Sequence, residues 1–391
     1  MNPTTARTTV GIIGGGPAGL LLARLLHRAG VDSVVLERCD RAYVEQRQRA
    51  GILEQATVDV LREVGAGERM DHEGLVHHGI ELRFDGRAHR IDFPGLACGR
   101  SVMVYAQTEV VKDLIALQLA QGGPLLFEAE VSRVTGTDTD SPVIHYRHEG
   151  QDRTLACDAV VGCDGFHGVA RNVFDGPRVF ERTYPYSWLG ILADAPPSYD
   201  ELIYAHSERG FALASMRTPT VSRLYLQVPN GTDPASWSDG QIWDELDFRV
   251  ATKMNRGAIM QKSVLPMRSF VSEPMRSGSL YLAGDAAHIV PPTGAKGLNL
   301  AITDVVVLAR ALAHRQATGE TALLDSYSAD SLRRVWRAEH FSYFMTSTLH
   351  TAPDQSPFET RLQLAQLDRI ASSPHAAAEL AENYTGLPLR P

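Results

Sequence analysis

A glycine-rich run near the N-terminus is the first part of the sequence with a clear chemical use. Residues 14–19 read GGGPAG and fit the pattern GxGxxG. Gly14 permits a tight turn, Gly16 lets the backbone approach a pyrophosphate, and Gly19 allows a helix to pack closely on a strand. The amide groups that begin this helix, around Ala18, would stabilise the negative charge of the phosphates.

A second signal is needed, because GxGxxG alone does not separate FAD from NAD. Glu37, about 20 residues after the glycines, would accept hydrogen bonds from a ribose of either dinucleotide. Residues 280–288 (LYLAGDAAH) predict a strand ending in Asp285, whose carboxylate can bind ribityl hydroxyls. The run 291–299 (PPTGAKGLN) then enters a helix whose N-terminus can hold the electron-rich edge of a reduced flavin. The two signals together indicate FAD, and the flavin-side contacts predicted in this helix are Gly297, Leu298 and Asn299.

A third motif places charged groups at the end of another predicted strand. Residues 162–168 (GCDGFHG) contain Asp164 and His167, and Arg171 follows. The chain has no second GxGxxG motif, so we expect a nicotinamide nucleotide to bind transiently over a groove.

The middle of the chain carries residues suited to an aromatic acid. Ser215 and Arg217 lie two apart on a predicted strand, so their side chains share one face. The planar guanidinium of Arg217 fits a carboxylate, and Tyr225 on the next strand could face it. From these residues alone, a solvated surface charge remains an open interpretation of Arg217.

The elements that would position these residues begin with an α/β pattern. Residues 8–13 and 33–37 read as strands on either side of a helix at 18–29, and helical patterns follow at 53–64 and 108–121. This first part of the chain is typical of a parallel sheet covered by helices.

The predicted secondary structure changes in the second half of the chain. Short β-like runs broken by Pro, Gly and Asn fill residues 180–270 and predict a separate antiparallel sheet. A strand at 278–283 and a helix at 296–313 return to the α/β pattern, and the tail 333–391 is mostly helical.

We therefore predict an α/β (α+β) fold, with a Rossmann-like FAD-binding domain, an inserted antiparallel-sheet substrate domain and a helical C-terminal segment. The predicted divisions are 1–178 for the first part of the FAD-binding domain, with some excursions into the substrate domain, 179–270 for the substrate domain, 271–345 for the return, and 346–391 for a helical segment at an interface.

Composition narrows the class of protein. The 391 residues carry a net charge of -8, which argues against nucleic acid as a partner. The four cysteines form no CxxC pair, so neither a metal site nor a redox disulfide is indicated, and a cytoplasmic protein is expected. We expect no signal peptide and no membrane span.

The three glycine-containing motifs, in this order, resemble those of the class A flavoprotein aromatic hydroxylases. The resemblance is strongest to members that act on 4-hydroxybenzoate, and it runs along the whole chain. The matching stretches are 49–55, 162–168, 201–205, 209–213, 266–270, 283–300 and 382–384. The resemblance implies an enzyme of aromatic catabolism that converts 4-hydroxybenzoate to 3,4-dihydroxybenzoate (protocatechuate) with O2 and NADPH or NADH, through a flavin C4a-hydroperoxide. It also suggests a homodimer.

The resemblance assigns roles to the middle segment. The substrate would be held by Tyr204, Ser215, Arg217 and Tyr225, with Arg217 on the carboxylate and Tyr204 on the phenol oxygen. The phenol proton would leave through Tyr204 and Tyr384 to His77.

Further implied contacts belong to the flavin and to the reductant. Pro292, by its carbonyl, and Asn299 would line the reacting face of the flavin, and Arg223 would support the flavin as it moves. Implied FAD contacts are Gly14, Gly16, Glu37, Arg49, Gln107, Asp164 and Asp285. Implied nicotinamide-nucleotide contacts are Arg38, Tyr43, Arg47, Arg49, His167, Arg171 and Arg268.

One departure from the family pattern bears on the reductant. Cys39 stands where a Gln usually follows Arg38, and Asp40 places a negative charge where a 2′-phosphate could sit. We therefore expect NADH to serve at least as well as NADPH. The alternatives for the whole chain are a hydroxylase of another phenolic acid, such as 3-hydroxybenzoate or a dihydroxybenzoate, a flavin dehydrogenase, and a non-catalytic flavin sensor.

Overall fold

A parallel sheet forms one lobe of the molecule. The structure is a computed structural model that describes residues 5–47, 51–174 and 176–388. The sheet has the order β19-β20-β13-β2-β3-β9, parallel except at β19. Its strands are β2 (Val10–Ile13), β3 (Ser33–Leu36), β9 (Leu125–Leu126), β13 (Ala159–Gly162), β19 (Arg276–Ser277) and β20 (Leu280–Leu282). The predicted βαβ unit is present, and its strands are buried as a sheet covered by helices requires.

Helices pack on this parallel-sheet lobe. Helix α1 (Pro17–Arg28) contacts both α6 (Gln107–Ala120) and α8 (Gly297–Thr318). Residues 18–23 and Leu26 of α1 are buried, because α6 and α8 both cover this helix. Among the described residues, α8 alone is long and apolar enough to span a membrane by length and composition, and 56% of its most apolar window is buried inside the fold.

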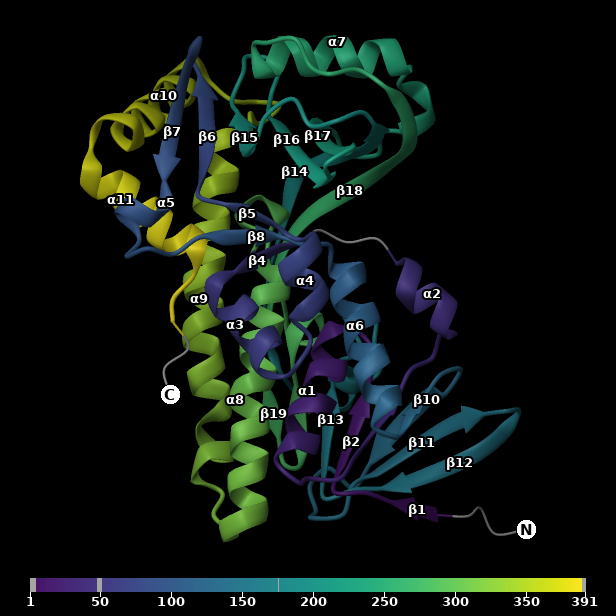
Figure 1. The fold of residues 1–391 in the computed structure, drawn as a ribbon. Helices are drawn as coiled ribbons and strands as arrows, with labels where there is room; N and C mark the ends of the chain where they lie inside the picture. The colour runs from purple at the N-terminus through teal and green to yellow at the C-terminus, as the bar shows by residue number, and fades with distance from the viewer. Residues whose placement is uncertain (1–4, 48–50, 175, 389–391) are drawn as a thin grey trace.

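A mixed eight-stranded sheet forms the second lobe, drawn above the first in Figure 1. Its order is β21-β18-β14-β17-β16-β15-β6-β7, and every pairing is antiparallel except β15 with β6. The strands are β6 (Gly79–Phe84), β7 (Arg87–Asp92), β14 (Arg178–Asp194), β15 (Leu202–Ala205), β16 (Ala212–Thr218), β17 (Val221–Pro229), β18 (Ala258–Glu273) and β21 (His288–Ile289). The predicted antiparallel sheet is present from β14 to β18, and the pairing of β15 with β6, from the first part of the chain, adds one parallel neighbour to it.

Two smaller sheets and several short helices complete the fold. One sheet is β1-β12-β11-β10 and the other is β4-β8-β5. Their strands are β1 (Thr5–Arg7), β4 (Ile52–Glu54), β5 (Leu75–His77), β8 (Val102–Val104), β10 (Glu130–Thr135), β11 (Val143–His148) and β12 (Gln151–Ala156). The short helices are α2 (Arg41–Gln46), α3 (Gln55–Glu63), α4 (Glu68–Glu73), α5 (Phe93–Leu96) and α7 (Asp239–Val250). The helix predicted from residue 53 thus begins at Gln55, after strand β4.

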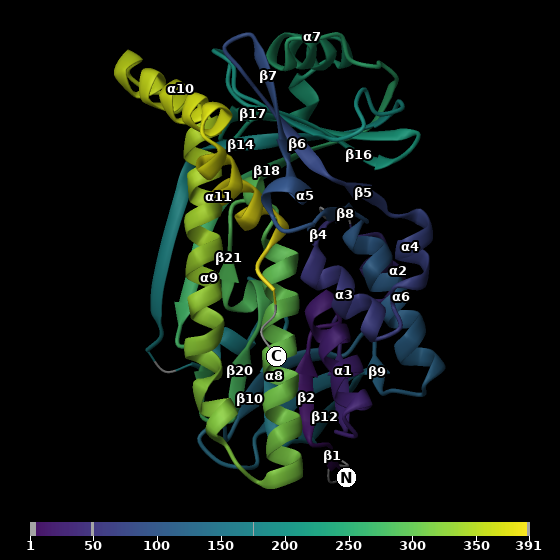
Figure 2. The same cartoon turned by 60° about the vertical axis from the view of Figure 1, so that its left-hand side comes forward.

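Three helices follow α8 and connect the lobes. They are α9 (Ala322–Leu349), α10 (Pro357–Ser372) and α11 (Pro374–Thr385). Figure 2 shows α9 running along α8 and on toward the mixed sheet, where α10 and α11 pack. The division predicted at 345/346 lies inside α9 and the one at 270/271 lies inside β18, so continuous elements cross both.

Candidate active site

One face of the mixed sheet gathers the residues predicted to bind the substrate. Tyr204 on β15 lies opposite Leu213 on β16, which lies opposite Tyr225 on β17. Ser215 pairs with Arg223 in the same ladder. Because alternate residues of a strand share a face, these side chains point to the same side of the sheet.

Arg217, on the strand that carries Ser215, has spare hydrogen-bonding capacity in a buried place. Its Nη2 donates to Thr108 Oγ1 at 3.0 Å, while its Nη1 is buried and has no partner among the residues that the structure describes. Burial, and then the nearby positive charge of Arg223, lower the pKa of Arg217. A guanidinium in this state attracts an anion, because the unpaired N–H groups cost free energy until an acceptor arrives.

Two tyrosines form the buried polar centre of this face. The hydroxyls of Tyr204 and Tyr384 are hydrogen-bonded at 2.7 Å, and both side chains are almost fully buried. Tyr384 comes from α11 and stacks on Phe93, with ring centroids 5.1 Å apart. Burial raises the pKa of both tyrosines, so both hydroxyls stay protonated at neutral pH.

His77 lies at the end of β5, in the small three-stranded sheet. It is buried, no described residue binds its Nδ1, and burial lowers its pKa to about 4. Among the described residues, no hydrogen bond joins His77 directly to Tyr384. The structure therefore supplies the tyrosine pair of the predicted relay and leaves its last step open.

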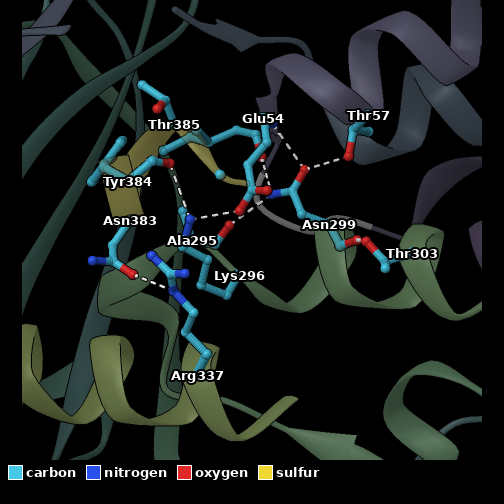
Figure 3. A network of polar contacts seen from close by, with 12 residues as sticks. Glu54, Thr57, Ala295, Lys296, Asn299, Thr303, Arg337, Asn383, Tyr384 and Thr385 are labelled. Atoms are coloured by element: carbon cyan, nitrogen blue, oxygen red, sulfur yellow. Dashed lines mark hydrogen bonds and ion pairs between the residues drawn. The ribbon is translucent and has the colours of Figure 1, made fainter. Parts of the chain in front are cut away.

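The predicted flavin-facing loop is held by a buried ion pair (Figure 3). Lys296 Nζ donates to Glu54 Oε1 at 2.5 Å and to the carbonyl of Tyr384 at 3.0 Å. Asn299 accepts from the backbone N–H of Glu54 and from the hydroxyl of Thr57. The loop that contains Pro292 is thereby tied to β4 on one side and to α11 on the other.

The glycine motif fits a bound dinucleotide. Gly14 has φ +107, and a Cβ there would lie 2.4 Å from the carbonyl oxygen of Cys163. A Cβ on Gly16 would meet nothing within 4 Å, so the space in front of this residue is open. No side chain caps the N-terminus of α1, and the same is true of α8. Both helices therefore offer uncapped amide groups, as an anion or a flavin edge requires.

The other predicted FAD contacts differ in what they already bind. Glu37 accepts from the backbone N–H groups of Gly15 and Cys39, which orients its carboxylate. Asp285 is exposed, while the residues on either side of it are buried. Asp164 accepts from the N–H of Ala170 through one oxygen, and its other oxygen is buried with no partner within the described part of the chain.

The remaining predicted cofactor residues lie near the substrate face or outside the described chain. Gln107 is the first residue of α6, adjacent to the Thr108 that binds Arg217. Arg223 lies over the ring of Tyr225, its guanidinium carbon 5.5 Å from the centroid. Arg49 lies outside the described residues.

The predicted nicotinamide contacts fall into two groups. Arg171 and Arg268 both lie over the ring of Phe166, beside His167. Arg171 also donates to the carbonyls of Phe166 and Ala286. The second group, on or beside α2, comprises the exposed residues Arg38, Tyr43 and Arg47.

Sequence reasoning missed several residues that hold the site. Lys296 and Glu54 lie within the stretches that carry the family resemblance, yet nothing in their spacing shows that they pair across 242 positions. Thr108 was likewise not predicted. The one usable signal is a lysine inside the glycine-rich run that enters α8, where a solvated charge is out of place.

Comparison with known proteins identifies the family. The family model described as an FAD binding domain matches residues 7–342. The chain belongs to this family. It is 46% identical over 390 residues to p-hydroxybenzoate hydroxylase of Acinetobacter baylyi, covering 98% of this chain and 96% of that protein. It is 28% identical over 357 residues to 3-(3-hydroxy-phenyl)propionate/3-hydroxycinnamic acid hydroxylase of Paraburkholderia xenovorans, covering 86% and 55% of the two chains.

The fold agrees with the family. The crystal structure of p-nitrophenol 4-monooxygenase from Pseudomonas putida DLL-E4 superposes with a TM-score of 0.84 at 20% identity, covering 98% of this chain and 99% of that one. The predicted fold class and the resemblance to flavoprotein hydroxylases are confirmed. FAD is the cofactor, and the chain is an FAD-dependent monooxygenase.

Proposed function

We propose that the enzyme hydroxylates 4-hydroxybenzoate beside its phenol oxygen and releases 3,4-dihydroxybenzoate, consuming O2 and NADPH or NADH. The observation that carries this proposal is the buried Nη1 of Arg217, which has no hydrogen-bond partner among the described residues and stands two residues after Ser215 on β16. The 46% identical relative named p-hydroxybenzoate hydroxylase supports the same substrate.

The substrate would lie along this face with its carboxylate on Arg217. A carboxylate can accept two parallel N–H groups from a guanidinium, which would satisfy Nη1 and fix the direction of the ring. Tyr225 would flank the acid, and Ser215, whose hydroxyl already donates to the carbonyl of Arg223, would line it. The phenol oxygen at the opposite end of the ring would then meet Tyr204.

The tyrosine pair provides the means to remove the phenol proton. An ionised phenolate is the stronger carbon nucleophile at the ortho position, so the proton must leave first. Because the pKa values of Tyr204 and Tyr384 are raised, the proton moves by concerted switching of their hydroxyl hydrogens without a tyrosinate. His77, neutral at pH 7, would accept it once a water molecule or a side-chain movement spans the gap from Tyr384.

The cofactor would be held by the two uncapped helix N-termini, by Glu37 and by Asp285. A bound flavin would supply the redox chemistry, namely electron transfer from the nicotinamide and activation of O2 for oxygenation of the aromatic ring. Pro292 and Asn299 would line its reacting face. The Lys296 contacts hold the loop of Pro292 between β4 and α11, and Asn299, on α8, donates to the carbonyl of Ile52. The chain's own contribution is to orient both rings and to exclude water.

Anaerobic flavin reduction with a panel of hydroxybenzoates tests the substrate assignment. Only the true substrate should greatly speed bleaching of the flavin by NADH or NADPH. Product analysis in air should then give 3,4-dihydroxybenzoate. No acceleration by 4-hydroxybenzoate would refute this substrate and leave FAD binding unaffected.

We also propose that NADH serves at least as well as NADPH. The Asp40 carboxylate accepts the N–H of Tyr43 and caps α2, so a negative charge already occupies the place where a 2′-phosphate would approach Arg38. The comparison of kcat/KM for the two reductants tests this, with Asp40→Asn as the variant that should favour NADPH. A strong NADPH preference of the unaltered enzyme would contradict it.

A homodimer in the cytoplasm completes the proposal. Exposed apolar side chains on the C-terminal helices, Trp336, Tyr343, Phe358 and Leu362, support a self-association surface. The four cysteines are unpaired, as a reducing compartment favours. Light scattering of the purified protein and cell fractionation test the two statements.

A further inference from the structure

A buried tryptophan, Trp188, lies next to the proposed substrate face and is hydrogen-bonded to a buried histidine, His350. Trp188 on β14 contacts Tyr225, with ring centroids 4.8 Å apart. Gly190, directly opposite Tyr225, has no side chain, so the indole two residues away covers the tyrosine ring. The indole N–H of Trp188 donates to Nε2 of His350 at 2.6 Å.

His350 is fixed on both sides. Its Nδ1 donates to the carbonyl of Thr346 at 2.9 Å, which determines the tautomer and leaves Nε2 as the acceptor. The imidazole ring stacks on Phe211 at 4.3 Å and on Tyr186 at 4.8 Å. This burial lowers the pKa of His350 to about 3, although the ring lies at the C-terminus of α9, where a cation would be favoured.

The same turn of α9 reaches the flavin-facing loop. The hydroxyl of Thr346 donates to the hydroxyl of Thr293 at 2.9 Å, and both residues are fully buried. Thr293 directly follows Pro292 in the short helix Pro292–Gly294. A continuous set of hydrogen bonds therefore runs from the flavin-facing loop through Thr346 and His350 to the indole of Trp188.

We propose that this hydrogen-bonded network, Thr293–Thr346–His350–Trp188, positions the aromatic substrate by setting its distance from the flavin and its tilt relative to it. His350 is its central positioning residue. The inference rests on the proposed function, because it assumes an aromatic ring against Tyr225.

The physical reason for such a device is geometric. The flavin-facing loop follows β21 at one edge of the mixed sheet, whereas Tyr225 lies on β17, three strands further into that sheet, so a tie from the loop to Trp188 on the intervening strand β14 limits movement between them. Displacements of about 1 Å between reacting groups can cost on the order of 100-fold in rate. Directional hydrogen bonds between fully buried groups resist such displacement better than apolar contacts, which tolerate sliding.

Two substitutions of His350 separate positioning from packing. In His350→Gln, the amide can still accept from the indole and donate to the Thr346 carbonyl. In His350→Phe, the stacked ring is retained and both hydrogen bonds are lost. His340→Gln, at an exposed position of the same helix, is the matched control. Thr346→Val breaks the contact with Thr293 while leaving its own carbonyl for His350, and Thr346→Ser retains the hydroxyl.

The first readout is the indole N–H resonance of Trp188 in the FAD-loaded enzyme labelled with 15N-tryptophan, assigned with Trp188→Phe. A strong hydrogen bond to an imidazole nitrogen shifts this proton downfield. We expect the shift in the unaltered enzyme, in His350→Gln and in Thr346→Val, and its loss in His350→Phe. An unshifted resonance in the unaltered enzyme would overturn the proposal.

The second readout is the yield of hydroxylated product per reductant consumed, with the Kd for 4-hydroxybenzoate measured beside it. We expect His350→Phe and Thr346→Val to lower this yield by about fivefold or more with the Kd changed less than the yield. The variants His350→Gln, Thr346→Ser and His340→Gln should keep it. Equal yields in His350→Phe and the unaltered enzyme, or equal losses in the Phe and Gln variants, would overturn the proposal.

Failure of the proposed function has a different signature. In that case the unaltered enzyme forms no product from 4-hydroxybenzoate, and the product yields of the variants have no reference value. The indole resonance still decides whether His350 holds Trp188. A downfield shift lost only in His350→Phe would then support the hydrogen-bonded chain, whereas no shift would refute it.

Discussion

Replacing Arg217 with methionine should weaken the binding of 4-hydroxybenzoate without lowering the stability of the ligand-free enzyme. Among the described residues, the guanidinium donates a hydrogen bond to Thr108, and its buried Nη1 has no partner. Methionine has a similar length, and its flexible chain fills irregular space. The ligand-free variant should therefore unfold at the same temperature as the unaltered enzyme, or at a higher one.

The loss of affinity follows from the substrate carboxylate, which would lose its positively charged partner. Without Arg217, the substrate carboxylate would be buried unpaired, and truncating one partner of a buried charge pair costs about 2–5 kcal/mol. At about 1.4 kcal/mol for each tenfold change, the Kd for 4-hydroxybenzoate should rise between about 30-fold and 4,000-fold. Phenol lacks the carboxylate, so its Kd should be nearly the same in both proteins.

Titration of the flavin absorbance with 4-hydroxybenzoate and with phenol measures both constants. The control is Arg209→Met, an exposed arginine paired with Glu245. An unchanged Kd for 4-hydroxybenzoate in Arg217→Met would refute the carboxylate contact. A fall in phenol affinity as large as that for 4-hydroxybenzoate would show that the substitution disturbs the whole site and would refute the reasoning as well.

Three further predictions concern the cofactor, the proton path and the pH dependence of stability. Gly16→Ala should weaken FAD binding with little change in the stability of the apoprotein, whereas Gly14→Ala should impair both. Of these two positions, only Gly14 has backbone atoms within collision distance of an added Cβ. Flavin release and thermal unfolding of the two apoproteins measure these effects. Tyr384→Phe should slow hydroxylation on the order of 100-fold, because Tyr204 loses its proton partner, while the Kd for 4-hydroxybenzoate stays within a few fold in a direct titration. The pKa of His350 is 6.5 in the unfolded chain and about 3 in the folded protein. Between these pH values the unfolded chain binds the proton and the folded protein does not, so the free energy of unfolding should fall as the pH is lowered. The contribution of this group is about 1.4 kcal/mol per pH unit. Denaturant titrations of His350→Gln should show a shallower fall, and an identical slope in both proteins would contradict the assigned pKa.

The sequence alone determined the features that are local in the chain. The glycine spacing of residues 14–19 and the strand and helix periods around it fixed the βαβ unit, because each position there is constrained by its own turn, strand or helix. Alternation along the strand predicted that Ser215 and Arg217 share a face, whereas the position of Tyr225 relative to them depends on the register between β16 and β17.

Only the tertiary structure decided which distant residues meet. It brought Tyr384 from the last helix to Tyr204, paired Lys296 with Glu54, and placed Thr108 against Arg217. These contacts depend on how α9, α11 and the two sheets pack, and neither hydrophobic period nor spacing encodes that packing. The sequence predicted that the first part of the chain contributes to the substrate domain, but not that β6 does so beside β15, because a strand's own residues specify which face is buried and the surrounding fold determines its neighbour.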